Sequence, residues 1–119
     1  IEIHKSLGPG LLESIYQNCM KYELNLRGIN FKSEMNIPII YKEVNLNSDL
    51  RFDLFVEDCL VIELKAIEAF APIHKAKLLT YMKLLNAPKG ILINFNCANI
   101  FNDGQKTFVN ELFKNLPDV

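Results

Sequence analysis

Cysteine is scarce in this chain, and its few cysteines lack the spacing of a disulfide or metal framework. Cys19, Cys59 and Cys97 are an odd number of widely separated residues, with no CxxC pair and no metal-finger spacing. We expect a reducing, cytoplasmic environment. We interpret the three thiols as small buried hydrophobes in preference to a catalytic nucleophile.

Long hydrophobic runs and an excess of charge are also absent. The longest apolar runs, such as residues 91–93, fall far short of the roughly 18 residues that a membrane span needs. The formal net charge is -1, so nucleic-acid binding would need a local patch or a bound metal. No signal peptide, linker or repeat is visible. Because the chain opens at Ile1 without methionine, we expect that some N-terminal residues are missing.

The remaining composition is that of an ordinary soluble globular protein. Half of the residues are apolar and 23% are charged, which argues against a disordered chain. At 119 residues, one domain over residues 1–119 would bury roughly two-thirds of the surface of the unfolded chain. We therefore predict a single domain with one real core.

Hydrophobic spacing predicts helices on either side of a strand-rich middle. Apolar residues at three- and four-residue steps predict helices over residues 9–26 and 72–85, and residues 1–5 resemble the tail of a further helix. Short β-rich runs separated by turn-favouring residues predict an antiparallel meander. Its strands are expected over residues 30–35, 37–41, 44–46, 50–56 and 59–65.

A last strand is predicted over residues 90–95, and its continuous apolar run indicates that both of its faces are covered. Helices should then pack on both sides of the sheet. The tail over residues 106–116 is open between a strand and a short helix. The predicted fold class is α/β (α+β), a mixed β-sheet flanked by helices in the order α-β-β-β-β-β-α-β.

Polar side chains interrupt two neighbouring predicted strands. Asp53 lies on one strand, and Glu63-Leu64-Lys65 begins ten residues later on the next. Since alternate residues of a strand share a face, Glu63 and Lys65 should project together while Ile62 and Leu64 point to the core. By the same alternation the preceding strand should place Leu50, Phe52, Leu54 and Val56 on one face and Arg51, Asp53 and Phe55 on the other.

Whether Asp53 meets Glu63 depends on the turn between their strands. A two-residue turn at Glu57-Asp58 would pair Asp53 with Ile62 and leave it across the sheet from Glu63. Asp53 and Glu63 can share a face only if the turn between the paired strand ends contains an odd number of residues. We therefore predict a three-residue turn or a bulge near residues 57–59.

Two carboxylates that meet in a partly dry site repel each other, and a hard divalent cation relieves that repulsion. Magnesium or manganese suits such oxygen ligands. The ion would polarise a phosphoryl oxygen and generate hydroxide, while Lys65 would orient or deprotonate the water or stabilise charge on the phosphate. The alternative is that Asp53, Glu63 and Lys65 form a solvated strand face with one surface ion pair. Spacing alone leaves both interpretations open.

Two motifs resemble those of known nucleases. Asp53-x9-Glu63-x-Lys65 resembles the motif of the PD-(D/E)xK nuclease superfamily, and residues 10–16, GLLESIY, resemble the signature of the bacterial and archaeal GxxExxY proteins. The resemblance covers nearly the whole chain. It includes HKSLGPG at residues 4–10, RFDLFV at 51–56, VIELKA at 61–66, PIHKAKLLTY at 72–81 and LINFN at 92–96.

The resemblance implies a restriction-endonuclease-like core in which Glu13, on the first long helix, completes the acidic cluster. Asp53 and Glu63 would hold Mg²⁺ or Mn²⁺ together with Glu13 and the carbonyl of Leu64. Asp53, Glu63 and Lys65 would be the catalytic residues. Taken without the resemblance, Glu13 is better interpreted as a solvated helix residue.

The predicted helix over residues 72–85 departs from the pattern of related nucleases. These often carry glutamine four residues before tyrosine, where this chain has Lys77 and Tyr81. Lysine can meet a phosphate, but it lacks the paired donor and acceptor of an amide. His74, Lys75 and Lys77 would form a basic patch beside the site, or else a solvated helix face. The candidate substrate-binding residues are His74, Lys77, Tyr81 and Tyr16.

The leading functional hypothesis is a metal-dependent nuclease that hydrolyses phosphodiester bonds in DNA or RNA, with DNA favoured. The rival hypothesis is a non-catalytic nucleic-acid-binding or protein-interaction module with the same fold. A third is a subunit that is active only in a homodimer or larger complex. Coordination of Glu13, Asp53 and Glu63 oxygens around one point would favour the enzyme, and carboxylates on different faces would favour the binding module.

Overall fold

The computed structural model describes residues 1–37, 39–46 and 48–115. Its helices are α1 (Glu2–Leu7), α2 (Glu13–Leu26), α3 (Pro72–Leu84), α4 (Ile100–Asp103) and the 3-10 helix η1 (Glu111–Asn115). Its strands are β1 (Phe31–Ile37), β2 (Ile40–Tyr41), β3 (Val44–Asn45), β4 (Ser48–Val56), β5 (Leu60–Lys65), β6 (Lys89–Asn94) and β7 (Gln105–Val109).

Five strands form one mixed sheet in the order β1-β4-β5-β6-β7. Neighbouring strands are antiparallel except β5 and β6, which are parallel and joined by α3. A mixed sheet flanked by helices confirms the predicted fold class. The predicted element order is confirmed from α2 to β6, but it omitted α4 and the strand β7, and the tail contains both a strand and a short helix.

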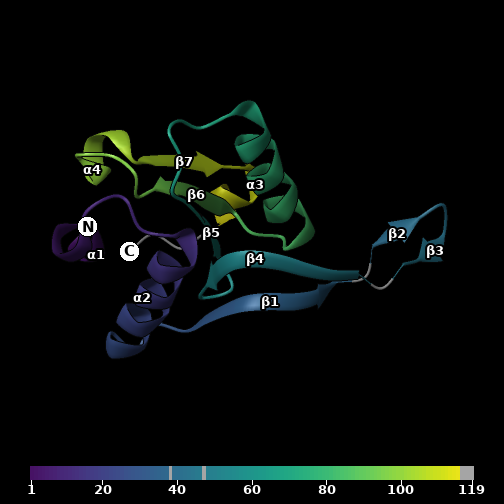
Figure 1. Cartoon of the computed structure of the whole chain (residues 1–119). Helices are drawn as coiled ribbons and strands as arrows, with labels where there is room; N and C mark the ends of the chain where they lie inside the picture. The colour runs from purple at the N-terminus through teal and green to yellow at the C-terminus, as the bar shows by residue number, and fades with distance from the viewer. Residues whose placement is uncertain (38, 47, 116–119) are drawn as a thin grey trace.

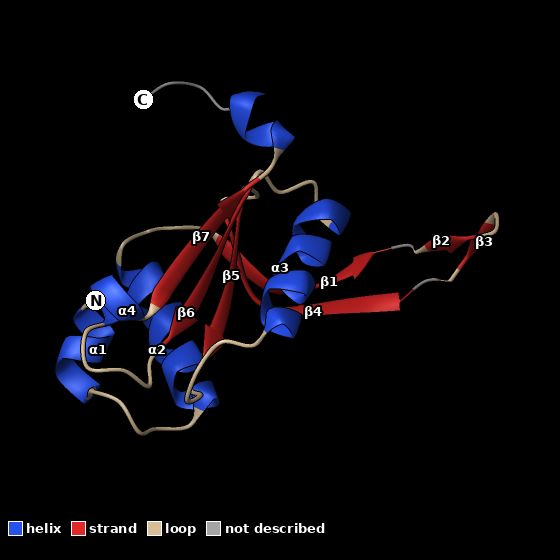
Figure 2. Cartoon of the chain, turned by 90° about the horizontal axis from the view of Figure 1, so that it is seen from above, coloured by secondary structure: helices blue, strands red, loops and turns tan. Residues whose placement is uncertain are grey.

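The predicted antiparallel meander is wrong, because β1 pairs with β4 and the two strands between them form a separate hairpin. The backbone of Lys42 and Glu43 has positive φ, 48° and 66°, as a two-residue type I′ turn requires. This turn pairs Tyr41 directly with Val44. The hairpin, β2–β3, closes on itself and projects beyond the ends of β1 and β4 (Figures 1 and 2).

Helices cover both faces of the sheet, as the apolar run in β6 predicted (Figure 1). One face packs against α1, α2 and α4 through a first cluster of buried residues: Ile3, Tyr16, Leu54, Val56, Ile62, Leu64, Phe95 and Ile100. The other face packs against α3 through a second cluster: Phe52, Phe55, Val61, Leu78, Met82, Ala87 and Leu92. No helix in the described residues is long and apolar enough to cross a membrane.

Helix α2 begins at Glu13 and not at Pro9, because the preceding loop contains two glycines with positive φ. Gly8 has φ 68° and Gly10 has φ 102°, values that a helix excludes and that glycine tolerates best. The Tyr16 hydroxyl fixes this loop by donating to the Gly8 carbonyl at 2.6 Å and accepting from the Leu11 amide at 3.2 Å. The loop thus delivers Glu13 at the first turn of α2.

Candidate acidic cleft

The turn between β4 and β5 contains an odd number of residues, which Asp53 and Glu63 require in order to share a face. Val56 pairs with Leu60, which leaves three residues, Glu57 to Cys59, in the turn. Glu57 and Asp58 have positive φ, 52° and 51°, and the Cys59 amide donates to the Val56 carbonyl at 3.0 Å. The predicted three-residue turn is confirmed. Continued along the strands, this register places Asp53 beside Glu63.

A bulge in β4 surrounds Asp53 on the side of β1. Lys32 pairs with Phe55 whereas Glu34 pairs with Arg51, so Ser33 alone faces the three residues 52–54 of β4. The predicted strict alternation is wrong here. Phe52 packs with Phe55 in the second cluster, while Leu54 lies in the first. Bulges of this kind redirect side chains, and this one reverses the faces of β4 at Asp53.

Each of the two carboxylates accepts a hydrogen bond from the backbone of the other strand. The Leu64 amide donates to Oδ2 of Asp53 at 2.7 Å, and the Asp53 amide donates to Oε1 of Glu63 at 3.2 Å. Glu63 is only 3% exposed, which excludes the solvated strand face for this residue. These reciprocal bonds continue the contact between β4 and β5 beyond their last paired residues, Leu54 and Ile62, and they hold the two acids together.

The pKa of Glu63 is raised from 4.5 to about 7, mainly by burial and then by the neighbouring Asp53 carboxylate. The hydrogen bond from the Asp53 amide, and then the cations Lys77 and Lys65, act in the opposite direction but do not offset the loss of hydration. The negative charges of ionised Asp53 and Glu63 repel each other, so a cation bound near both would stabilise their ionised forms. A titration near neutral pH is also typical of functional acids.

The two acids lie in a cleft of about 400 Å³ between α2, α3 and the β1–β4–β5 part of the sheet. Four cations line it together with four acids. Lys65 at the end of β5 lies 3.9 Å from Oε1 of Glu13, the first residue of α2. Lys77 enters from α3 with its Nζ 5.4 Å from the centre of the Tyr81 ring. The cleft thus holds Asp53, Glu63, Lys65, Lys77 and Glu13.

The two paired carboxylates each have an oxygen that a cation could use. Oδ1 of Asp53 and Oε2 of Glu63 take part in no hydrogen bond within the described part of the chain, and no buried side-chain oxygen there lacks a partner, so the free Glu63 oxygen must reach the cleft. Carboxylate oxygens are the preferred ligands of Mg²⁺. Within residues 1–37, 39–46 and 48–115, however, no three acidic, histidine or cysteine side chains are close enough to hold a metal ion.

The other candidates for substrate binding have structural contacts. Tyr16 is fully buried, its ring stacks on Phe95 at 4.2 Å, and its hydroxyl is used by the loop before α2. The Nδ1 of His74 accepts from the Ala71 amide at 2.9 Å at the start of α3. Tyr81 packs at the edge of the second cluster. Of the four candidates, Lys77 is the one that lines the cleft.

Several residues that line the cleft or fix the loops beside it were missed at the level of sequence. Gln17 and Lys21 line it from α2, and the Gln17 amide donates to the Asp53 carbonyl at 3.2 Å. The steps of four residues from Glu13 to Gln17 and from Gln17 to Lys21 were a usable signal, since residues at such steps share a helix face. Asn94, buried at the end of β6, bonds both the amide and the carbonyl of Ile67 and so fixes the loop after Lys65.

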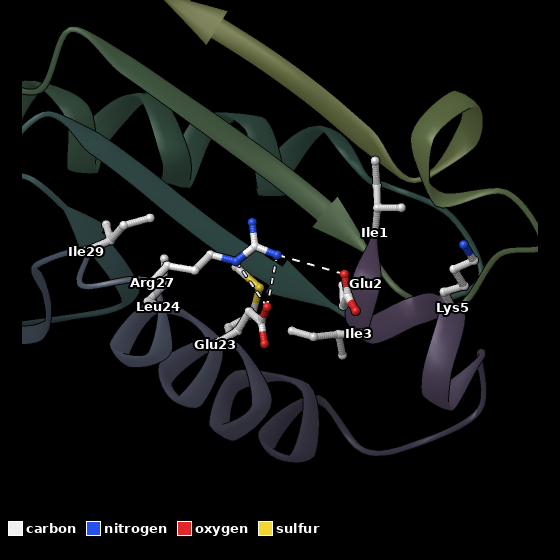
Figure 3. Close-up of a pocket in the computed structure, with 9 residues that line it drawn as sticks. Ile1, Glu2, Ile3, Lys5, Glu23, Leu24, Arg27 and Ile29 are labelled. Atoms are coloured by element: carbon white, nitrogen blue, oxygen red, sulfur yellow. Dashed lines mark hydrogen bonds and ion pairs between the residues drawn. The ribbon is translucent and has the colours of Figure 1, made fainter.

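A separate hollow of about 450 Å³ lies between α1 and α2 (Figure 3). Its walls are mostly apolar, with Ile3, Leu24 and Ile29 among them. Arg27 extends over it to Glu2 at 3.9 Å and to Glu23 at 2.9 Å. Its lining includes neither of the paired carboxylates, so the acidic cleft remains the candidate functional site.

A family model described as the PD-(D/E)XK nuclease superfamily, named PDDEXK_3, matches residues 1–107. No curated protein and no solved structure matches the chain. The five-stranded mixed sheet with helices on both faces is consistent with the restriction-endonuclease-like core of that superfamily. The chain belongs to the PDDEXK_3 family of the PD-(D/E)XK nuclease superfamily.

Proposed function

We propose that this protein is a metal-dependent nuclease that hydrolyses phosphodiester bonds in DNA or RNA, with DNA the favoured substrate. The observation that carries the proposal is the pairing of the Asp53 and Glu63 carboxylates, through reciprocal backbone hydrogen bonds, in the cleft that also holds Lys65. Membership of a nuclease superfamily supports it. The narrower assignment to the GxxExxY proteins rests on Gly10, Glu13 and Tyr16.

In this proposal Asp53 and Glu63 would hold Mg²⁺ or Mn²⁺, with the Leu64 carbonyl as a further ligand. Glu13, which contacts Lys65 in this structure, would complete the acidic set. When bound, the ion supplies a Lewis acid for the phosphoryl oxygen and lowers the pKa of a bound water. The shift of the Glu63 pKa towards 7 means that metal binding displaces a proton there.

Two lysines act on the substrate in this proposal. Lys65 orients the attacking water and stabilises negative charge on the phosphate as the bond from phosphorus to the leaving oxygen breaks. Lys77, which lines the cleft from α3, contacts a phosphate oxygen in place of the amide that related nucleases use. An ammonium supplies charge but no acceptor, so Lys77 binds phosphate without selecting its orientation.

A non-catalytic nucleic-acid-binding module is the second candidate, and one observation favours it. Within the described residues no three metal-ligating side chains converge, and Glu13 pairs with Lys65. A domain that kept the fold and the cations that line the cleft, but lost metal binding, would have these features. It would bind nucleic acid without cleaving it.

The test is cleavage of single- and double-stranded DNA and RNA with Mg²⁺, with Mn²⁺ and with a chelator. We expect metal-dependent cleavage that falls roughly 100-fold or more in Lys65→Ala and Asp53→Asn. The matched control is Lys83→Ala, an exposed lysine on α3 that does not line the cleft. Cleavage that persists in Lys65→Ala would contradict the proposal, and binding without cleavage would establish the second candidate.

A further inference from the structure

A polar stripe on α2 faces the acidic cleft. Glu13, Gln17 and Lys21 follow one another at four-residue steps, so they share one face of the helix, and all three line the cleft. Glu13 pairs with Lys65, and Gln17 donates to the carbonyl of Asp53. Lys21 has neither a hydrogen bond nor an ion pair within the described residues. Lys21 is therefore the residue of this stripe that is available to bind a ligand.

The other cations of the cleft already have contacts. Lys65 lies near Glu13, and Nε of Arg51 lies 3.4 Å from Oε2 of Glu34. Lys77 lies over the Tyr81 ring. Lys21, in contrast, is partly buried, lines the cleft and makes no ion pair or hydrogen bond in the described part of the chain. Its ammonium group is therefore available to an anion, which would gain a charge-assisted hydrogen bond.

The position of Lys21 indicates which anion. Gln17 touches the backbone of Asp53, and Lys21 lies one helical turn further along α2, about 6 Å from Gln17 by the rise of 1.5 Å per residue. A phosphate at Lys21 is therefore displaced from the paired carboxylates by about the reach of one nucleotide. Arg51 approaches the same wall from β4, and its ion pair with Glu34 is exposed and so weak enough to exchange.

We propose that Lys21, together with Arg51, binds the phosphate next to the scissile one, so that the cleft takes a polynucleotide strand and not an isolated phosphodiester. This inference rests on the proposed function, because it places the scissile phosphate at Asp53 and Glu63. It assigns the residues of the cleft different tasks. Asp53, Glu63 and Lys65 act at the bond that breaks, and Lys21 and Arg51 hold the flanking backbone.

The experiment measures binding, so that cleavage does not affect it. In the Asp53→Asn background, fluorescence anisotropy follows a labelled tetranucleotide and a longer single strand over a range of salt concentrations. We expect Lys21→Ala to weaken binding about 10-fold. It should also reduce the steepness of the plot of the logarithm of the association constant against the logarithm of the salt concentration by about 0.7, the value for one phosphate contact on a single strand. Lys21→Arg should retain the slope.

Two comparisons keep this inference separate from the proposed function. Lys83→Ala, an exposed lysine outside the cleft, should leave affinity and slope within twofold of the parent. A dinucleotide, which has a single phosphate, should gain little from Lys21. If the longer strand binds equally well with and without Lys21, the flanking-phosphate inference is wrong. If binding depends on Lys21 while the wild-type chain cleaves nothing, the proposed nuclease function fails, but the phosphate contact at Lys21 stands.

Discussion

Two hairpins of this protein use the same turn chemistry and differ by one residue. In β2–β3, Lys42 and Glu43 both have positive φ and connect the directly paired Tyr41 and Val44. In β4–β5, Glu57 and Asp58 also have positive φ, but Cys59 follows before pairing resumes between Val56 and Leu60. The extra residue changes the parity of the register, and parity decides which face each side chain takes.

The consequences of that parity are large because only one hairpin is buried. The β4–β5 hairpin has helices against both faces and brings Asp53 beside Glu63. The β2–β3 hairpin projects from the molecule with its apolar side chains exposed (Figure 1). A turn therefore specifies a functional site only when the strands beside it are fixed by a core. The β2–β3 hairpin should tolerate changes that its counterpart does not.

Truncating one apolar side chain in each hairpin should give the largest contrast. Leu54 is 0% exposed and Ile40 is 71% exposed. We expect Leu54→Ala to lower the free energy of unfolding by about 4 kcal/mol, since it removes buried methyl groups and leaves a cavity. Ile40→Ala should change it by less than about 0.5 kcal/mol. Urea denaturation measures both, and comparable losses would mean that the projecting hairpin belongs to the core.

The pH dependence of stability should be the next largest difference, because β4–β5 contains a buried acid. The pKa of Glu63 is raised from 4.5 to about 7 in the folded state, mainly by burial. Between these values the folded protein binds more protons than the unfolded chain, so the free energy of unfolding falls as pH rises. The loss should total about 3 kcal/mol between pH 4.5 and 7 and then level off.

Substitution of the acid isolates this contribution. Glu63→Gln should remove the decline between pH 4.5 and 7, whereas Glu34→Gln, an exposed acid on the rim of the same cleft, should preserve it. Chemical denaturation at several pH values gives the slopes. A decline that survives in Glu63→Gln would assign the titration to another group and would remove the evidence that the paired acids repel each other.

Much of the fold could be predicted from the sequence, because local patterns encode it. The period of apolar residues located α2 and α3, and the apolar run of β6 indicated cover on both faces. The start of α2 was missed because Gly8 and Gly10 adopt positive φ, which hydrophobic spacing does not report. The meander was wrong because strand pairing is not local. No local feature of the sequence near β1 indicates that this strand pairs with β4, on the far side of the β2–β3 hairpin.

The register that the candidate site requires could be predicted from the sequence, but most of the backbone and packing features around the site could not. Parity alone required an odd offset between Asp53 and Glu63, and the three-residue turn supplied it. The bulge at Asp53 could not be foreseen, because it depends on how β1 and β4 match across the intervening hairpin. The burial that raises the pKa of Glu63 likewise comes from residues of several elements. Spacing on α2, in contrast, could have indicated Gln17 and Lys21.

A third contrast uses backbone strain at equivalent turn positions. Asp58 and Glu43 both have positive φ, a conformation that a β-branched residue adopts only with strain of roughly 1–2 kcal/mol. We expect Asp58→Val to destabilise the protein by about 2 kcal/mol, since it also removes the ion pair with Lys32 at 3.1 Å. Glu43→Val should change global unfolding by less than about 0.5 kcal/mol, because only the projecting hairpin opens.

The control for this pair is Asp58→Asn, which loses the charge but tolerates positive φ. It should cost less than about 1 kcal/mol, the usual range of an exposed ion pair. Urea denaturation of the three variants separates strain from electrostatics. Equal losses in Asp58→Val and Asp58→Asn would attribute the effect to the ion pair and would remove the strain argument.

Deletion of Cys59 should have the smallest effect, although it alters the turn that creates the site. Without Cys59, Val56 and Leu60 flank the two-residue turn Glu57-Asp58, as Tyr41 and Val44 flank theirs. The pairing of Val56 with Leu60 then survives, and Asp53 remains beside Glu63. We expect stability to change by less than about 1 kcal/mol, with the decline between pH 4.5 and 7 intact as a sign that Glu63 is still buried. A variant that folds but lacks this decline would show that the three-residue turn is needed to keep Glu63 buried. Retention of the decline would show that a two-residue turn supports the same pairing of β4 with β5.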